Sequence, residues 1–452
     1  MQAQYPSGPD KHPTSGTIPM RNAPLLLSIT GALVLACSTV IAVPVQPWII
    51  GNLDISKTDK ASPTLQRAVD LIRKGETDAA EEAFNEVLAA DPESAEAYLG
   101  LAEIRLRKAD LEGAGTYARK AIDAKPDSAG IWVSYGNVQV LQGRLPEAEA
   151  AYQKAIRLHD FYLPAYMAYG DLLQRKLKKP QQAIEMYQKA VAIDGNRASS
   201  RFALATAYAT VGDMPNAELA LREAARLAPA DPLPRHTLGR LLAAQQKFDA
   251  AVEQFSAALE VKPDFQPALL DRADVLAEIQ RNEEAVRDYR AILEKQPDDA
   301  QLNLKLALVT QRTGDMAAAT RQYKRTLALN PNMALAYNNL AWIGLQTGGD
   351  LEQADAWARQ AVRLAAKVPQ FHDTLGWITR ARGKPREALR HLQTAAGLEP
   401  PQAAVHYHMG VIHQEMGNRN AAATAFKRAL QIDATFADAA DANKRLAALS
   451  AN

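Results

Sequence analysis

Small and apolar residues recur along this chain with a period of 34 residues, from residue 61 to residue 436. Glycine near the middle of the period and proline near its end divide each repeat into two segments, which predicts a pair of helices per repeat. Nine repeats have 34 residues, and two, 163–197 and 334–368, have 35. The eleven repeats begin at residues 61, 95, 129, 163, 198, 232, 266, 300, 334, 369 and 403.

The strongest signal is the twentieth position of the repeat, which is alanine in all eleven, allowing for the extra residue in the two longer repeats. The eighth position is always glycine or alanine. Two helices approach closely only where the facing side chain is a hydrogen atom or a methyl group, and a bulkier residue would cost about 1–3 kcal/mol. Both positions therefore predict where the paired helices cross. The alanines are Ala80, Ala114, Ala148, Ala183, Ala217, Ala251, Ala285, Ala319, Ala354, Ala388 and Ala422.

Three further positions support the same division. Position 24 is aromatic in seven repeats and is predicted to fill the space between one helix pair and the next. Position 15 is glycine in seven repeats, which suits a left-handed turn between the two helices. Position 32 is proline in seven repeats and is predicted to end the second helix. Ala118 and Ala358 replace the aromatic residue in the second and ninth repeats, and Arg105 takes an inner position in the second, so looser packing is expected there.

This pattern resembles the tetratricopeptide repeat family over about five-sixths of the chain. The resemblance implies an all-α fold, a right-handed α-solenoid of eleven antiparallel helical hairpins over residues 61–436 with a concave groove. Residues 437–449 have the pattern of an amphipathic helix, so residues 437–452 are interpreted as a capping helix and tail that cover the open end of the array.

The N-terminal residues predict a membrane segment. Residues 1–24 are rich in proline, serine and glycine and are predicted to be disordered, and residues 46–60 to be a linker. Residues 25–45 contain no charge over 21 residues, which is long enough for a membrane-spanning helix, and Trp48 follows at an interfacial position. One interpretation is a retained anchor. The other is a lipoprotein signal that starts at Met20 rather than Met1 and ends at Cys37, a possible lipidation site.

The charge around this segment leaves the orientation open, because Lys11 and Arg21 precede it while Lys57 and Lys60 follow it. The lipoprotein alternative and the nearness of Arg21 favour a body outside the cytoplasm. The predicted location is therefore the inner membrane, with a single span and a periplasmic body; the alternatives are an outer-membrane lipoprotein or a body facing the cytoplasm.

Composition narrows the classes of partner. With 52 Lys and Arg against 51 Asp and Glu, the net charge of +1 gives no overall electrostatic attraction for nucleic acid, so none is predicted to bind. Cys37 is the single cysteine, so the repeats contain neither a disulfide nor a cysteine-based metal site. The oligomeric state is not encoded in any pattern recognised in the sequence.

The family resemblance places positions 2, 5, 9, 12 and 13 of each first helix on the concave surface. In the last three repeats these positions predict a partner-binding groove with two tryptophans at equivalent places, beside an amide, a carboxylate and a guanidinium. An equally weighted alternative is that both indoles pack between hairpins. The predicted groove residues are Asn338, Trp342, Asp373, Trp377, Arg380 and Tyr407.

Catalytic chemistry finds no support in the sequence. It contains no phosphate-binding loop, no dinucleotide fingerprint, no GxSxG and no HExxH motif, so no enzyme activity, cofactor or catalytic residue is predicted. His406 and His413 share one helix face while His408 points elsewhere, which is a poor arrangement for one metal ion. The chaperone-binding subclass of the family clamps a C-terminal carboxylate with Lys and Asn at set positions, and those residue types do not recur here in adjacent repeats.

These observations predict a membrane-tethered scaffold that binds proteins or peptides in its groove. The segments 337–342 and 373–377 resemble those of tetratricopeptide proteins from bacterial exopolysaccharide and protein-sorting (PEP-CTERM type) loci, which implies a role in assembly or export of an envelope or exopolysaccharide component. The alternative hypothesis is a substrate-presenting or regulatory subunit of a separate enzyme.

Overall fold

The computed structural model describes residues 62–450, and this part of the chain is all-α, with no β-strand. It forms two compact units, one up to Val275 and one from Leu276 onward, which are treated separately below as the N-terminal and the C-terminal unit. No helix between residues 62 and 450 has both the length and the apolar character needed to cross a membrane. The predicted tail, membrane segment and linker, Cys37 included, lie outside the described residues.

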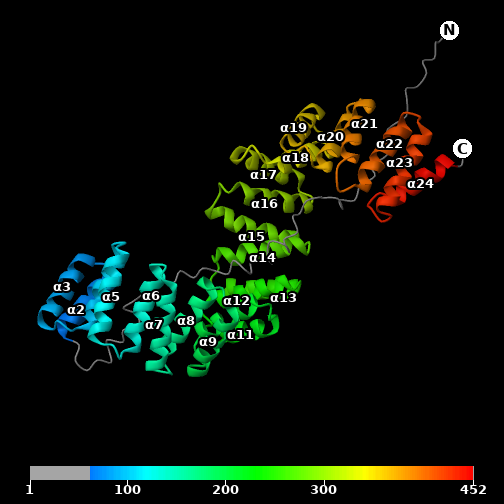
Figure 1. Cartoon of the computed structure of the whole chain (residues 1–452). Coiled ribbons are helices and arrows are strands. Elements are labelled where there is room, and N and C mark those ends of the chain that lie inside the picture. Colours follow the sequence, from blue (N-terminus) through cyan, green and yellow to red (C-terminus); the bar gives the residue numbers. More distant parts are fainter. Residues whose placement is uncertain (1–61, 451–452) are drawn as a thin grey trace, which may run out of the picture. The chain divides into compact units, whose positions relative to one another are not determined.

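In the N-terminal unit, consecutive helices pack as pairs joined by short turns (Figure 1). An even-numbered helix comes first in each pair and is called a first helix, and its odd-numbered partner is called a second helix. The helices are α2 (Pro63–Lys74), α3 (Thr77–Ala90), α4 (Ala95–Arg107), α5 (Leu111–Ala124), α6 (Ala129–Leu141), α7 (Leu145–Leu158), α8 (Leu163–Asp171) with the π-helix η3 (Leu172–Lys176), α9 (Pro180–Ile193), α10 (Ala198–Thr210), α11 (Met214–Leu227), α12 (Pro232–Ala244), α13 (Phe248–Val261) and α14 (Gln266–Glu278), which ends in the C-terminal unit.

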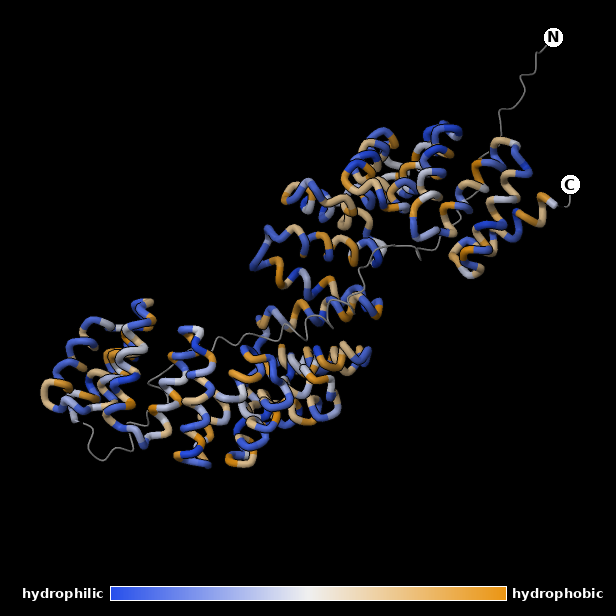
Figure 2. The backbone as a smooth tube through the Cα atoms, viewed as in Figure 1, coloured by the Kyte–Doolittle hydropathy of each residue, from blue (hydrophilic) through white to orange (hydrophobic). Residues whose placement is uncertain are grey.

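The C-terminal unit continues the same alternation of first and second helices. Its helices are α15 (Asn282–Lys295), α16 (Ala300–Arg312), α17 (Met316–Leu329), α18 (Ala334–Gln346), α19 (Leu351–Leu364), α20 (Pro369–Ala381), α21 (Pro385–Ala396), α22 (Ala403–Glu415), α23 (Arg419–Ile432) and α24 (Ala439–Ser450). The last helix packs on α23 and buries Ala442 completely. Polar and apolar residues alternate along every helix (Figure 2), as expected for helices that pack on several sides and keep one face in water.

The small residues of the repeat lie at the helix crossings. All eleven alanines at position 20 have 0% relative exposure. A Cβ atom built on Gly136 would come within 2.5 Å of the Tyr152 ring, and one on Gly239 would come within 2.6 Å of Phe255. The aromatic residue at position 24 therefore covers position 8 of its own repeat, which adds to its predicted place between repeats. Phe84 also meets the next repeat, because a Cβ on Gly100 would lie 2.2 Å from its ring.

The turn between the two helices requires a left-handed residue at position 15, as the glycine pattern predicts. All seven glycines at this position have positive φ angles, for example 85° at Gly75. The four repeats without glycine keep the same backbone conformation, at Ala109, Lys178, Gln246 and Gln280. The conformation therefore belongs to the repeat itself, and the four other residues adopt it against their steric preference.

The two longer repeats accommodate their extra residue in different ways. In repeat 163–197 the first helix widens into the π-helix η3, which takes up one residue within the helix. In repeat 334–368 the turn is longer: Gly349 follows the left-handed Gly348 before Asp350 caps α19. Both devices leave Ala183 and Ala354 in register, with 0% exposure.

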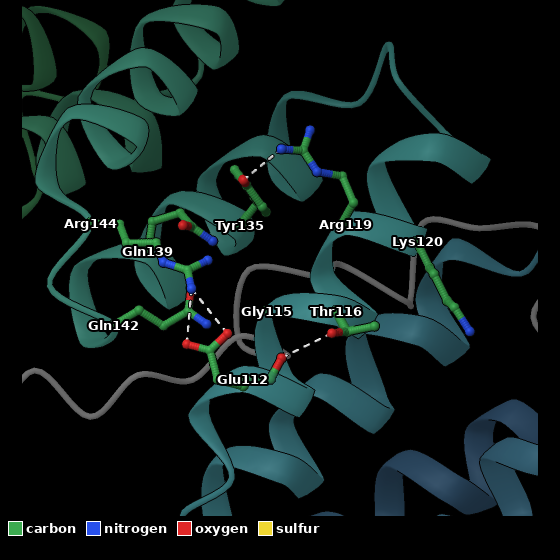
Figure 3. Close-up of a pocket in the computed structure, with 9 residues that line it drawn as sticks. All are labelled: Glu112, Gly115, Thr116, Arg119, Lys120, Tyr135, Gln139, Gln142 and Arg144. Carbon is green, nitrogen blue, oxygen red and sulfur yellow. Dashed lines mark hydrogen bonds and ion pairs between the residues drawn. The ribbon is translucent and has the colours of Figure 1, made fainter.

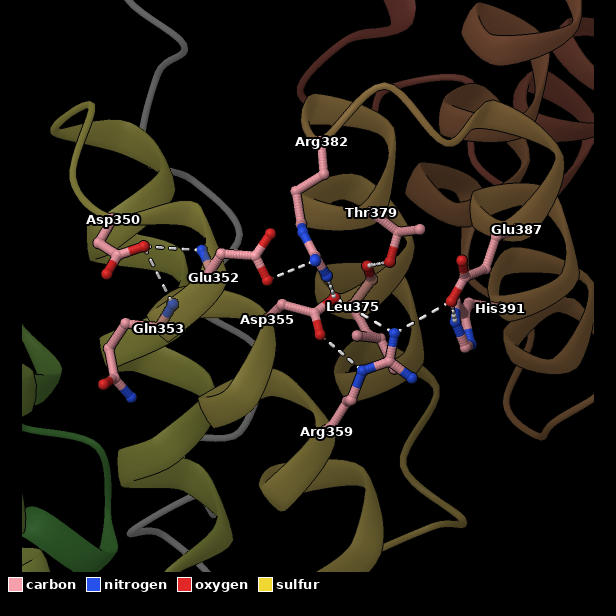
Figure 4. Close-up of polar contacts among 10 residues, drawn as sticks. All are labelled: Asp350, Glu352, Gln353, Asp355, Arg359, Leu375, Thr379, Arg382, Glu387 and His391. Carbon is pink, nitrogen blue, oxygen red and sulfur yellow. Dashed lines mark hydrogen bonds and ion pairs between the residues drawn. The ribbon is translucent and has the colours of Figure 1, made fainter.

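An ion-pair network centred on the buried Asp355 occupies the ninth repeat, where Ala358 replaces the aromatic residue (Figure 4). Asp355 accepts a hydrogen bond of 2.6 Å from Arg359 Nε and lies 2.7 Å from Arg382 Nη1, and its side chain is 8% exposed. Arg359 also donates to Glu387 of α21 at 3.0 Å. Burial opposes ionisation of Asp355, but the two arginines outweigh it and lower the pKa of that carboxyl. Polar contacts thus join successive repeats at a place where an aromatic side chain is missing.

Candidate partner-binding surface

The first helices of neighbouring repeats contact one another directly. In the C-terminal unit, α18 contacts α20, and α20 contacts α22; in the N-terminal unit the same holds for α2, α4, α6 and α8. Contacts of similar extent between successive second helices are absent from residues 62–450. The first helices therefore lie on the inner side of the array in these segments, as the predicted groove requires, and their exposed residues form what we call the inner face.

Trp377 lies at the centre of the inner face of α20 and α22. Its indole is half-buried and stacks on the His408 ring, with centroids 4.1 Å apart and an angle of 24° between the planes. The Arg380 guanidinium lies 4.3 Å from the centroid of the same indole. Offset stacking and a cation over an aromatic face are both favourable contacts. The indole is therefore held in one orientation while part of it remains accessible.

Two polar contacts surround this stack and link α20 to α22. A hydrogen bond of 2.7 Å joins His408 Nδ1 to Asp373 Oδ1, and both side chains are largely buried. Arg380 Nε donates to Glu415 Oε2 at 2.8 Å. Asp373 and Arg380 thus each have a partner on the neighbouring first helix, and these contacts hold the side chains around Trp377 in place.

A second set of contacts links α22 to the last helix. Tyr407 donates a hydrogen bond of 2.7 Å to Asp441 Oδ2, and Arg445 contacts the same carboxylate and donates to Gln414 Oε1 at 3.0 Å. Burial raises the pKa of the Tyr407 phenol, and the bond to Asp441 raises it further. Burial opposes ionisation of Asp441, but Arg445 and Tyr407 outweigh it and lower the pKa of that carboxyl. Helix α24 therefore continues the inner face and also supplies charges to it.

Asn338 and Trp342, on α18, do not join this cluster. Asn338 is 6% exposed, and its Oδ1 is buried without a hydrogen-bond partner. Trp342 is half-buried, and no ring contact joins it to Trp377 or to any other aromatic residue between 62 and 450. Of the predicted groove residues, the structure brings together Asp373, Trp377 and Arg380, and connects Tyr407 to the same helices.

Several residues of this cluster were not predicted from the sequence. The sequence pattern marks His408 only as a poor metal ligand, and it does not mark Glu415, Asp441 or Arg445. The available signal was the spacing: each of these contacts joins residues 31–35 apart, which is one repeat. Complementary polar side chains one repeat apart are therefore the feature of the sequence that indicates these contacts.

The repeat pattern and the paired helices agree with the comparison with known families. One model, described as tetratricopeptide repeat, matches residues 65–129, 120–162, 170–232, 236–300 and 304–369, and a second of the same description matches residues 403–436. These matches span more than half of the chain.

The chain belongs to the tetratricopeptide repeat family.

Members of this family act as scaffolds for protein–protein interaction and are generally not enzymes. Solved structures similar to this chain include a tetratricopeptide repeat protein from Parabacteroides merdae (19% identity, 56% of this chain and 99% of that chain, TM-score 0.44). They also include Pseudomonas aeruginosa pilF (21% identity, 48% and 96%, TM-score 0.41) and yeast Tom70 (13% identity, 86% and 95%, TM-score 0.38). No curated protein sequence matches the chain.

A second histidine–carboxylate pair occupies the same register in the N-terminal unit of this tetratricopeptide array. His236 and Asp271 occupy positions 5 and 6 of successive repeats, and Asp373 and His408 occupy the same positions in the opposite order. His236 Nε2 lies 2.8 Å from Asp271 Oδ2, and His236 is 3% exposed. Histidine–carboxylate pairs therefore join neighbouring first helices at two places. The pair of Asp373 and His408 also orients the partly accessible Trp377 ring.

The remaining histidines of α22 do not form a metal site. His406 and His413 are half-buried, and burial lowers the pKa of both. No group of three or more possible metal ligands comes together within residues 62–450. His408 is already bound to Asp373, so the three histidines act separately.

A surface pocket of about 340 Å³ lies in the N-terminal unit, between α5 and α6 (Figure 3). It opens beside Gly115, in the repeat where Ala118 replaces the aromatic residue. Its two arginines already have partners: Arg119 donates to the Tyr135 hydroxyl at 2.9 Å, and Arg144 pairs with Glu112 at 2.9 Å. The third cation, Lys120, lies near the Tyr98 and Tyr117 rings.

Proposed function

We propose that this chain is a non-catalytic tetratricopeptide scaffold that a segment at residues 25–45 tethers to a membrane. It gathers protein partners along the inner face of its C-terminal repeats, in the assembly or export of a bacterial envelope component such as an exopolysaccharide. The proposal includes eleven repeats over residues 61–436, closed by residues 437–452, with the body in the periplasm.

The observation that carries the proposal is the fixed, partly accessible indole of Trp377. Binding energy at protein interfaces is concentrated in a few residues, among which tryptophan, tyrosine and arginine are enriched. Because His408 and Arg380 already hold the ring, little side-chain entropy is lost when a partner covers it. Asp373, Arg380 and Glu415 then form a polar rim around an apolar contact.

The binding surface extends over several first helices, so affinity is a sum over repeats. Asn338 and Trp342 of α18, the cluster of α20 and α22, and Tyr407 beside α24 would each contribute part of an extended contact. An extended peptide or a helix laid along these residues suits such a surface.

A pull-down from detergent-solubilised membranes tests partner binding, with the full chain compared to two tryptophan variants. Trp377→Ala removes the inner-face indole. Trp357→Ala is the matched control, because Trp357 is also half-buried but lies on the second helix α19. We expect envelope proteins to be retained by the wild type and by the control, and lost from Trp377→Ala. Partners drawn only from soluble cytosolic proteins would contradict the proposal, as would equal losses in both variants.

The tether is tested separately, by fractionation of cells that produce the full chain or a version without residues 25–45. We expect the full chain in the membrane fraction and the shortened chain released from it. Radioactive palmitate distinguishes the two kinds of tether: label on Cys37 indicates a lipoprotein, and its absence indicates a retained helix. Recovery of the full chain in the soluble fraction would refute the tether and leave the inner-face proposal to its own test.

A further inference from the structure

A cluster of exposed cations lies at one turn of the N-terminal unit, between the two helices of the first of the longer repeats. Lys176 ends the π-helix η3, Lys178 has a left-handed conformation with a φ angle of 55°, and Lys179 directly precedes α9. All three residues are exposed, and so is the neighbouring Arg175. Four cations within five residues therefore project from a single turn.

The three lysines of this turn have no acidic partner. None of them forms an ion pair with any residue between 62 and 450. The cation at the position of Lys179 in the preceding repeat is Arg144, which lies 2.9 Å from Glu112 of the repeat before it (Figure 3). Lys179 lacks such a partner because Pro146 stands at the position that corresponds to Glu112. The positive charge of the turn is therefore not neutralised within the array.

These lysines also contribute little to the stability of the turn. A left-handed conformation is disfavoured for a residue with a Cβ atom, which applies to Lys178. Lys179 lies at the N-terminus of α9, where negative charge is favoured, and it makes no capping hydrogen bond with its side chain. At the same position, Asp110 and Asp213 cap α5 and α11. The fold gives no reason for positive charge here, which points to an interaction outside the chain.

Exposed apolar side chains lie beside the neighbouring turns. Four large hydrophobic residues within 62–450 are exposed, and two of them are Leu111, which begins α5, and Leu141, which ends α6, each 40% exposed. Gln142 Nε2 donates to the Leu111 carbonyl oxygen at 2.8 Å, and η3 contacts α7. The turns of three successive repeats therefore share one edge. We call this edge the basic turn edge and define it by Leu111, Leu141, Lys176, Lys178 and Lys179.

We propose that the basic turn edge lies on the anionic headgroups of a lipid bilayer, with the leucines at the boundary of the acyl chains. Lysine is a compact, hydrated point charge, which suits a diffuse layer of charge better than bidentate recognition of one carboxylate. Clustered basic residues beside apolar side chains are typical of segments that bind anionic membrane surfaces. This contact goes beyond the proposed function: a tether at residues 25–45 would bring the edge close to a bilayer, but the contact does not depend on it.

The test is hydrogen exchange of the full chain in lipid nanodiscs made of phosphatidylcholine alone or mixed with phosphatidylglycerol. The charge variant combines Lys176→Gln, Lys178→Gln and Lys179→Gln. Glutamine suits this turn because Gln246 adopts the same left-handed conformation in another repeat. Melting curves confirm that each variant is folded. The control variant carries glutamine at three exposed lysines outside the basic turn edge: Lys125, Lys189 and Lys262.

We expect exchange at residues 176–180 to slow at least about threefold in the anionic nanodiscs and not in the others. The effect should vanish in the charge variant and persist in the control variant. Residues 245–247, a turn of the same unit in which Lys247 pairs with Glu218 at 3.4 Å, should not change. Exchange that is independent of lipid charge, or slowing that survives in the charge variant, would overturn the inference.

Two further outcomes separate this contact from other interactions. Slowing caused by added polyglutamate but not by anionic lipid would overturn the inference in favour of an acidic protein partner. If the full chain does not enter nanodiscs, the proposed tether fails. Vesicles of the same two compositions, added to the soluble chain, then test the basic turn edge by the same criteria.

Discussion

Two stretches of first helices in the C-terminal unit differ in whether the polar groups at their groove positions have partners. On α20, α22 and α24, Asp373 meets His408, Arg380 meets Glu415, and Tyr407 meets Asp441. On α16 and α18, Arg312 and Asn338, both at predicted groove positions, keep buried polar atoms without partners. The helices belong to the same repeat pattern, so the difference lies in the side chains and not in the backbone.

The comparison contrasts a surface whose side chains are already held in place with one whose buried polar atoms have no partners. In the α20–α24 stretch the side chains around Trp377 are already paired, so the indole is held in place and would anchor a partner at low entropic cost. In the α16–α18 stretch, buried polar atoms without partners lower the stability of the fold.

The largest expected effect comes from removing the anchor. Trp377→Ala should lower the free energy of unfolding by about 2 kcal/mol, because the indole stacks on His408 and packs against two buried clusters. Trp342→Ala, at the equivalent position of the preceding repeat, should cost roughly half as much, because that indole has no ring contact. Urea unfolding of both variants measures the difference. Equal losses would remove the distinction between the two stretches.

The arginines of the two stretches should respond with opposite signs. Arg445→Met leaves Gln414 without this donor and Asp441 with only the Tyr407 hydroxyl, and it should destabilise the chain by about 1 kcal/mol. Arg312→Met removes an uncompensated charge and should raise the melting temperature slightly. Thermal unfolding monitored by circular dichroism gives both values. A loss of stability in Arg312→Met would mean that the guanidinium has a compensating partner after all.

The hydrogen bond from Tyr407 to Asp441 links α22 to the last helix, and one substitution tests it. Tyr407→Phe deletes the donor to Asp441 and keeps the ring among Phe426 and Phe436, so it should cost about 1 kcal/mol or less. Hydrogen exchange should show faster opening of α24 and no change in α16–α18. Uniform loosening of both stretches would contradict the local role assigned to this bond.

A fall in pH should lower the stability of the α20–α24 stretch before that of α16–α18, by less than the substitutions described above. Burial lowers the pKa values of His391, His406 and His413, with Arg359 and Arg428 adding to it for the first two. The unfolded chain therefore takes up protons first as the pH falls, so stability is complete above the unfolded value of 6.5 and declines below it.

The measurement for this effect is hydrogen exchange at about pH 7.5 and about pH 5.5. Helices α21 and α22 carry these histidines, whereas α16 to α18 contain none, so protection should fall in the former and persist in the latter. Exchange that changes equally in both stretches, after correction for the intrinsic pH dependence of exchange, would be inconsistent with this assignment.

The sequence predicts the repeated features well, because each depends on a local rule. Alanine at position 20 marks the helix crossings, and the left-handed turn at position 15 appears even where Ala109 or Gln246 replaces glycine. The 35-residue repeats indicate an insertion but not its form: one becomes the π-helix η3 and the other lengthens a turn at Gly349.

The candidate site is predicted less well, because its chemistry depends on which side chains of successive repeats meet. Trp377 and Trp342 occupy equivalent positions, yet only the first is stacked, since His408 has no counterpart beside the second. Arg312 has an ordinary groove position in the sequence, and only the arrangement of its neighbours leaves it without a partner. Pairing of this kind depends on side-chain conformation, which the periodicity does not encode.

The most direct test of the account is site-specific photo-crosslinking in intact cells. A photoreactive residue is placed at Gln346, an exposed residue at the end of the first helix α18, or at Arg321, an exposed residue of the second helix α17. The account predicts crosslinks to defined envelope proteins from Gln346, their loss when Trp377→Ala is added, and none from Arg321. Crosslinks from Arg321 alone, or crosslinks from Gln346 that survive Trp377→Ala unchanged, would contradict a binding surface on the inner face.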